Sequence, residues 1–196
     1  MQNILITWTS RWIWKYLADN LKKDFNLIEI KWKKHCDLSK TENIKDFVNS
    51  IGNIVFDAVI LNAWVGIFWN FEEHSIEEYE YVINVNLLAN IRLLKLLEKN
   101  LTKKTKIIFI WSIIWKKFIR WASVYQASKF WLRGFAWWLK TEWKKVFIIN
   151  PKIVDTDFHK WKITLNPKWE RTSLVSILNT VKNILNWKEN RFEIDL

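Results

Sequence analysis

The stretch that decides the fold runs from Asn3 to Lys15 and reads N-I-L-I-T-W-T-S-R-W-I-W-K. Its first part, Ile4 to Thr7, is mostly apolar and predicts a buried parallel strand. Apolar residues then recur at helical spacing over residues 12–23, which predicts an amphipathic helix. The chain therefore opens with a strand that turns directly into a helix.

The turn between this strand and this helix carries tryptophan at positions 8, 12 and 14. Rossmann-type folds hold the pyrophosphate of a dinucleotide at such a turn, and there the turn is rich in glycine. Glycine permits positive φ and lets the backbone amides approach the phosphates. Three indoles in a tight turn follow no such backbone logic, so they need a separate explanation.

The composition suggests that explanation. The chain has 16 Trp and 3 Gly in 196 residues, whereas an average chain of this length has about 14 Gly. The excess of tryptophan and the deficit of glycine are similar in size. We therefore hypothesise that many positions written Trp are glycine in the working protein, as when a genetic code reads UGA as glycine. UGG codons at these positions would refute the hypothesis.

Length and composition also bound the class of protein. The length predicts one domain over residues 1–196 with a sizeable core. No apolar run of about 18 residues and no secretion signal is present, so we expect no membrane span and a cytoplasmic protein. Cys36 is the one cysteine, which excludes an internal disulfide and suits a reducing compartment. His35, His74 and His159 lack metal-ligand spacing, so we predict no metal.

The net charge of +11 leaves two interpretations open. A basic, aromatic-rich surface could bind nucleic acid. The basic residues form no single long block, however, and a solvated cationic surface is the simpler interpretation, so we expect no nucleic-acid partner. Positive charge would also help the protein to bind a phosphorylated cofactor.

The rest of the chain alternates predicted strands with predicted helices. We expect further strands at 27–31, 56–61, 106–110, 146–149 and 191–195, and helices at 41–51, 75–100, 122–143 and 172–186. Residues 35–39 predict a third strand shortened to a stub. Thr41 is a candidate N-cap, and Ser75 with Glu78 fits a capping box. This alternation predicts an α/β fold, a single Rossmann-type doubly wound parallel sheet flanked by helices.

With glycine at the written tryptophans, the first turn becomes T-G-T-S-R-G-I-G, which resembles the T-G-x-x-x-G-x-G cofactor turn of the short-chain dehydrogenase/reductase family. Further segments resemble the same family in order over residues 3–156: L-N-A-W at 61–64, Asn86, Ser112, Y-Q-A-S-K at 125–129 and Pro151. Tryptophan also stands where the family has glycine at positions 32, 64, 115 and 131. The chain departs from the family at Leu61, an asparagine there, and at Lys152, a glycine there.

Tyr125 and Lys129 lie four residues apart, on one face of a predicted helix. A phenol has an ordinary pKa of about 10. A nearby ammonium lowers that pKa, so that the phenol can exchange a proton with a substrate oxygen. The resemblance implies that Ser112 binds the same oxygen and that Lys129 also holds the nicotinamide ribose. It implies further that the helix opens at Asn86, whose carbonyl holds a water of a proton relay.

The resemblance also implies a site for a nicotinamide cofactor. Its implied residues are Thr7, Trp8, Ser10, Arg11, Trp12, Ile13, Trp14, Lys33, Asp37, Leu38, Asn62, Ala63, Trp64, Tyr125, Lys129, Pro151, Ile153 and Thr156. An acidic residue after the second strand favours NAD, and a basic one accommodates the 2′-phosphate of NADP. Lys33 and Arg11 are both basic, so we expect NADP(H), with NAD(H) as the alternative.

These features imply an NADP(H)-dependent oxidoreductase that transfers hydride between the nicotinamide and a carbonyl or alcohol substrate. The substrate-loop region, residues 157–171, is short, and the sequence says little about the substrate. The family resemblance implies a homodimer or homotetramer through the helices at 75–100 and 122–143. Two alternatives stay open. Genuine tryptophans in the turn would favour a non-catalytic nucleotide-binding protein on the same fold, and the third interpretation is a basic nucleic-acid-binding protein.

Overall fold

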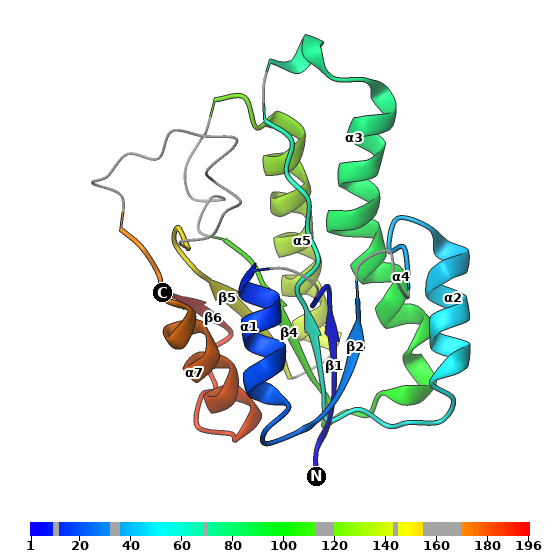
Figure 1. Ribbon diagram of the computed structural model, residues 1–196, viewed down its shortest axis with the longest axis vertical. Coiled ribbons are helices and arrows are strands. Elements are labelled where there is room, and N and C mark those ends of the chain that lie inside the picture. The colour runs from blue at the N-terminus through cyan, green and yellow to red at the C-terminus, as the bar shows by residue number, and fades with distance from the viewer. Residues whose placement is uncertain (10–11, 32–35, 69, 113–119, 143–144, 155–169) are drawn as a thin grey trace.

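The computed structural model describes residues 1–9, 12–31, 36–68, 70–112, 120–142, 145–154 and 170–196. Within them, six strands form one parallel sheet in the order β2-β1-β3-β4-β5-β6 (Figure 1). The strands are β1 (Asn3–Thr7), β2 (Asn26–Ile30), β3 (Ala58–Leu61), β4 (Lys106–Ile110), β5 (Val146–Asn150) and β6 (Glu193–Asp195). The predicted doubly wound parallel sheet is confirmed.

Alternating side chains along the strands build a hydrophobic core on each face of the sheet. Ile4 and Ile6 of β1 point to one face, and Leu5 points to the other. The four central strands keep this alternation, with buried apolar residues on both sides. Near-continuous apolar runs are what a parallel sheet covered on both faces requires.

Helices cover both faces of the sheet (Figure 1). On one face lie α1 (Trp12–Leu21) and α7 (Leu174–Leu185), whose apolar sides share a core cluster with the strands. The other face carries α2 (Thr41–Ser50), α4 (Ala89–Leu96) and α5 (Ser123–Glu142). Helix α3 (Ile76–Ile83) precedes α4 and packs against α5. None of the described helices is long and apolar enough to span a membrane.

The long helix expected at 75–100 is divided into several segments. A π-helical turn, Asn84–Leu88, separates α3 from α4, and a short 3-10 turn follows at Glu98–Asn100. The capping box that begins α3 is confirmed, because Ser75 N donates to Glu78 Oε2 at 3.0 Å and Glu78 N donates to Ser75 Oγ at 3.3 Å. The local opening expected around Asn86 is therefore present as a π-helical turn.

Two local expectations need correction. Thr41 is the first residue of α2 and not its N-cap, which is Lys40 without a side-chain cap. The stub strand expected at 35–39 is reduced to a single bridge residue, Cys36, among the described positions. Asp37 explains both findings, since its Oδ1 accepts hydrogen bonds from Ser39 N at 3.0 Å and Ser39 Oγ at 2.7 Å, which turns the chain directly toward α2.

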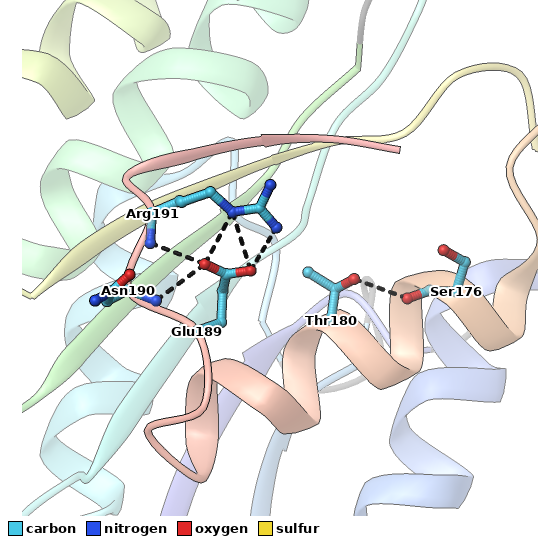
Figure 2. Close-up of polar contacts among 5 residues, drawn as sticks. All are labelled: Ser176, Thr180, Glu189, Asn190 and Arg191. Atoms are coloured by element: carbon cyan, nitrogen blue, oxygen red, sulfur yellow. Dashed lines mark hydrogen bonds and ion pairs between the residues drawn. The ribbon is translucent and has the colours of Figure 1, made fainter.

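The segment between α7 and the edge strand β6 is held by a carboxylate (Figure 2). Glu189 Oε1 accepts hydrogen bonds from the backbone N–H of Asn190 at 3.0 Å and of Arg191 at 2.9 Å. The Arg191 guanidinium lies 2.6 Å from Oε2, and these contacts lower the pKa of the Glu189 carboxyl to about 2. Within α7, Thr180 Oγ1 donates to Ser176 O at 2.9 Å. These contacts fix the local conformation from which the chain enters β6.

Candidate active site

The candidate site begins where β1 and β3 end. The chain passes from β1 to β2 on one side and later returns to β3 on the other side of β1, so this is the switch point of the sheet. Thr7 Oγ1 accepts hydrogen bonds from Asn62 N at 2.9 Å and Ala63 N at 3.0 Å. Asn62 Nδ2 donates to Thr7 O at 3.2 Å, while its Oδ1 is buried without a hydrogen-bond partner in the described structure. A polar acceptor is thus available at the switch point.

Trp8, directly after β1, has φ of 60° and donates its N–H to Ile30 O at 2.7 Å. That left-handed conformation is one that glycine adopts readily and that bulky side chains rarely adopt. The backbone at position 8 therefore has the conformation that a glycine-rich cofactor turn requires.

Tyr125 and Lys129 lie on α5 and are almost completely buried, at 3% and 2% exposure. Lys129 Nζ is 5.6 Å from the centroid of the Tyr125 ring, so the two groups share one face of the helix as predicted. Burial lowers the pKa of Lys129 to about 7, and burial raises the pKa of Tyr125. With tryptophan at 64 and 111, burial therefore shifts the phenol pKa in the direction opposite to the lowering expected from Lys129.

Indole rings fill the space between the first turn and this pair. The ring centroids of Trp14 and Trp64 are 6.4 Å apart, and those of Trp64 and Tyr125 are 5.9 Å apart. Lys129 Nζ lies 5.3 Å from the Trp64 ring and 5.1 Å from the Trp111 ring. The residues as written therefore do not fit a dinucleotide that must reach from the turn to Tyr125 and Lys129. Side chains without rings at 14 and 64 would leave that space open.

Asn86, in the π-helical turn, joins three segments around the pair. Its Oδ1 accepts from Val65 N at 2.7 Å, and its Nδ2 donates to Val65 O at 2.8 Å and to Ser128 Oγ at 2.9 Å. Ser128 Oγ in turn donates to Tyr125 O at 2.6 Å. Asn90 Nδ2 donates to Asn86 O at 2.8 Å. Asn86 thus fixes the segment after β3 and the start of α5 relative to each other.

Three of these partners were missed by sequence reasoning, namely Val65, Ser128 and Asn90. Ser128 carried a usable signal, since it is a hydroxyl residue between Tyr125 and Lys129 on a helix that the sequence predicts. Val65 gave none, because Asn86 binds its backbone and not its side chain. Asn90 lies four residues after Asn86, a spacing at which a side-chain amide reaches a helical carbonyl.

Other expected residues follow the same edge of the sheet. Ser112 lies two residues after the end of β4, following Trp111, and is half-buried. Pro151 follows β5 and is buried, and Ile153 forms a bridge with Arg171. Because the carboxyl ends of parallel strands meet at one edge, Ser112 and Pro151 lie along the same edge as the switch point.

The remaining expected positions divide into two groups. Asp37 is held by Ser39, and Leu38 is buried in the core cluster shared with α2. Trp12 and Ile13 form the start of α1. Ser10, Arg11, Lys33 and Thr156 lie outside the described residues, as does most of the substrate loop at 157–171. In the part of the chain that is described, no three His, Cys, Asp or Glu side chains gather as a metal site would require.

Solved structures share this fold over the whole chain. A short chain dehydrogenase family protein from Francisella tularensis is 22% identical with a TM-score of 0.85, and the match covers 100% of this chain and 97% of that one. The 3-ketoacyl-(acyl-carrier-protein) reductase from Brucella melitensis, solved with NADH, is 16% identical with a TM-score of 0.86, and the match covers 100% of this chain and 96% of that one. The alcohol dehydrogenase from Thermococcus sibiricus, solved with 5-hydroxy-NADP, is 24% identical with a TM-score of 0.77, and the match covers 100% of this chain and 96% of that one. At these identities the likeness concerns the fold.

Sequence comparison extends the likeness to the family. Ketoacyl reductase HetN from Nostoc sp. is 33% identical over 97 residues, which is 47% of this chain. The match spans about a third of that relative, 34% of its length. The family model described as short chain dehydrogenase matches residues 17–164, well over half of the 196 residues. Together with the parallel sheet and the Tyr125–Lys129 pair at its edge, this match establishes that the chain belongs to the short-chain dehydrogenase family.

Proposed function

We propose that this protein is an NADP(H)-dependent oxidoreductase that acts on a carbonyl or alcohol substrate. The observation that carries the proposal is the buried Tyr125–Lys129 pair on α5, tied through Ser128 and Asn86 to the segment after β3. Family membership supports an oxidoreductase, and two solved relatives carry NADH and an NADP derivative. The hydride itself would be carried by the nicotinamide when it is bound.

Four residues of the chain have separate roles in this proposed reaction. The Tyr125 phenol exchanges a proton with the substrate oxygen, and the Ser112 hydroxyl orients that oxygen. Lys129 supplies positive charge beside the phenol and binds the nicotinamide ribose. Asn86 would hold a water at its carbonyl, which also accepts a hydrogen bond from Asn90 Nδ2, and this water together with Lys129 would replace the proton on Tyr125. The protein thus contributes position and protons.

This function requires that the tryptophans at the cofactor site be glycine in the working protein. Trp14 and Trp64 lie between the turn and Tyr125, so a nicotinamide could not reach the phenol past their rings. Among the described residues, every non-glycine with positive φ is a tryptophan: Trp8 at 60°, Trp121 at 61° and Trp187 at 60°. Asparagine and aspartate are the usual non-glycine residues in this region. The backbone therefore supports glycine at these positions, as UGA recoding would supply.

Trp187 supports glycine independently of any cofactor motif. It follows Asn186, the C-cap of α7, and its N–H donates to Ile184 O at 3.1 Å. Lys188 N donates to Asn183 O at 2.8 Å. These two bonds form a Schellman motif, whose left-handed residue is usually glycine.

The finer details of the proposal rest on the charges and the relatives. Arg11 and Lys33 favour NADP(H) over NAD(H), because each offers a cation to a 2′-phosphate. The ketoacyl reductase relative suggests a 3-oxoacyl substrate as a first probe, though it matches over 34% of its length. We also propose that the chain forms a single domain, works in a reducing cytoplasm and assembles as a homodimer or homotetramer.

The test uses Tyr125→Phe in the protein with glycine at 8, 12, 14 and 64. We expect the variant to lose NADPH-dependent reduction of acetoacetyl thioester while it binds NADPH with nearly unchanged affinity, because only the phenol oxygen is removed. Turnover follows from NADPH absorbance, and binding from NADPH fluorescence. Retained turnover would refute the role given to Tyr125.

A second function is favoured by the burial of Tyr125 in the chain with tryptophan at position 64. With Trp64 genuine, Tyr125 is 3% exposed and a substrate oxygen has no route to its phenol. The chain would then be a non-catalytic protein on a Rossmann-type scaffold. Failure of the Trp-containing chain to bind NADPH, with tryptophan found in the native protein, would favour this alternative.

A further inference from the structure

Phe68 is the second aromatic side chain that packs on Tyr125, and its identity does not depend on any tryptophan. The two ring centroids are 5.4 Å apart with an interplanar angle of 58°. Phe68 is 6% exposed and forms a small buried cluster with Ala122 and Tyr125. Glycine at position 64 would remove the Trp64 ring from this cluster and leave the Phe68 ring in place.

The segment that carries Phe68 is anchored by backbone contacts at Val65. Asn86 binds both the N–H and the carbonyl of Val65, three residues before Phe68, at 2.7 and 2.8 Å. The same Asn86 amide donates to Ser128 Oγ, which donates to Tyr125 O. The segment that carries Phe68 and the helix that carries Tyr125 are therefore held by one shared side chain.

We propose that Phe68 is a specificity-determining residue, which presents an aromatic wall beside the Tyr125 phenol and selects carbonyl substrates with an apolar substituent next to the carbonyl. The inference rests on the proposed function and deepens it by naming the substrate class. An aryl or alkyl group can pack on the ring, whereas a hydroxylated group would lose its hydration there without gaining a hydrogen bond from the ring.

The experiment compares two ketones, acetophenone and hydroxyacetone, with NADPH as the reductant. All variants are made in the protein with the residues that mass spectrometry reads at the tryptophan positions. We expect the native protein to favour acetophenone in kcat/KM, and Phe68→Ala to reduce that preference at least about tenfold, chiefly through KM. Phe68→Leu keeps an apolar wall and should recover most of the preference.

Phe71 supplies a matched control. It is a phenylalanine of the same segment, 61% exposed, and it stacks on Tyr79 with a centroid distance of 5.1 Å. Phe71→Ala therefore removes the same group and an aromatic contact, but not from Tyr125. We expect it to leave the preference for acetophenone unchanged.

A second readout needs no substrate. This readout uses the chain with tryptophan at 64, in which burial raises the pKa of Tyr125, so Phe68→Ala should admit water and lower that pKa, while Phe71→Ala should not. The phenolate absorbance of each protein, minus that of its Tyr125→Phe counterpart, measures this shift.

The outcomes separate the two proposals. An unchanged ketone preference in Phe68→Ala, or a native preference for hydroxyacetone, would overturn the role of Phe68 and leave the oxidoreductase proposal intact. Reduction of neither ketone nor any other carbonyl in a broad panel would overturn the proposed function, and this inference with it. In that case the phenolate titration still reports whether Phe68 shields Tyr125.

Discussion

At the scale of the residue, the buried ammonium of Lys129 controls how stability depends on pH. Burial lowers its pKa from 10.5 to about 7 in the folded chain. Between these two values the unfolded chain binds more protons than the folded chain, so stability rises with pH over this window. We expect the melting temperature to rise between about pH 7 and pH 10 in the chain with tryptophan at 64 and 111.

The variant Lys129→Met tests this expectation. It should flatten the rise and increase the melting temperature near pH 7 by about 5 °C, since no charge is then buried. Lys106 also has a pKa lowered by burial, to about 8, but it is present in both proteins and cancels in the comparison. Equal slopes for the two proteins, measured by scanning calorimetry, would contradict the account of Lys129.

At the scale of the element, the end of α7 distinguishes a strained tryptophan from a tolerated one. A bulky residue in the left-handed conformation of position 187 costs about 1–2 kcal/mol. The Trp187 ring is exposed, and it regains part of this through Lys106 and Lys145, whose Nζ atoms lie 3.7 and 4.7 Å from its centroid and which together contribute about 0.5–1 kcal/mol. Trp187→Gly should therefore stabilise the Trp-containing chain by about 1 kcal/mol in urea unfolding.

Trp138 is the matched control for that prediction. It is 73% exposed, like the partly exposed Trp187, but it lies inside α5 where φ is helical. Trp138→Gly should destabilise the chain by about 0.5 kcal/mol, because glycine is the poorer helix former. A loss of stability at both positions would count against strain at position 187.

Element boundaries also mark where sequence reasoning reaches its limit. Apolar runs in β1 and β4 were sufficient to predict buried strands, because both faces of a parallel sheet are covered. The prediction that Thr41 caps α2 was wrong, since Asp37 and Ser39 form a turn that shifts the start of the helix. The packing of Phe68 on Tyr125 could not be predicted, because it depends on a backbone contact between Val65 and Asn86, 21 residues apart.

At the scale of the whole molecule, the charge of +11 gives a test of the nucleic-acid interpretation. Contacts to phosphates release counterions, so binding through a cationic surface alone weakens steeply with salt. We expect any binding to duplex DNA, measured by fluorescence anisotropy, to be weak at 50 mM salt and lost by about 200 mM. Binding that discriminates between sequences at 200 mM would favour a nucleic-acid-binding protein instead.

The whole fold could be predicted because strands and helices alternate along the chain and the chemical motifs follow in order. Whether the cofactor site is filled or open could not be predicted, because this depends on side-chain volume at a few positions. Trp14 and Trp64 together decide whether the switch point is filled or open, and the motif alone does not show that the Trp14 ring packs on Trp64 or that the Trp64 ring reaches Tyr125.

The identity of the turn residues is the central claim, and peptide mass spectrometry on the protein isolated from its source tests it most directly. Tryptic cleavage after Arg11 and Lys15 separates position 8 from positions 12 and 14. We expect the mass of glycine at all three positions, and hence an open cofactor turn. Tryptophan at these positions would contradict it, and the chain would then be a non-catalytic protein on a Rossmann-type scaffold.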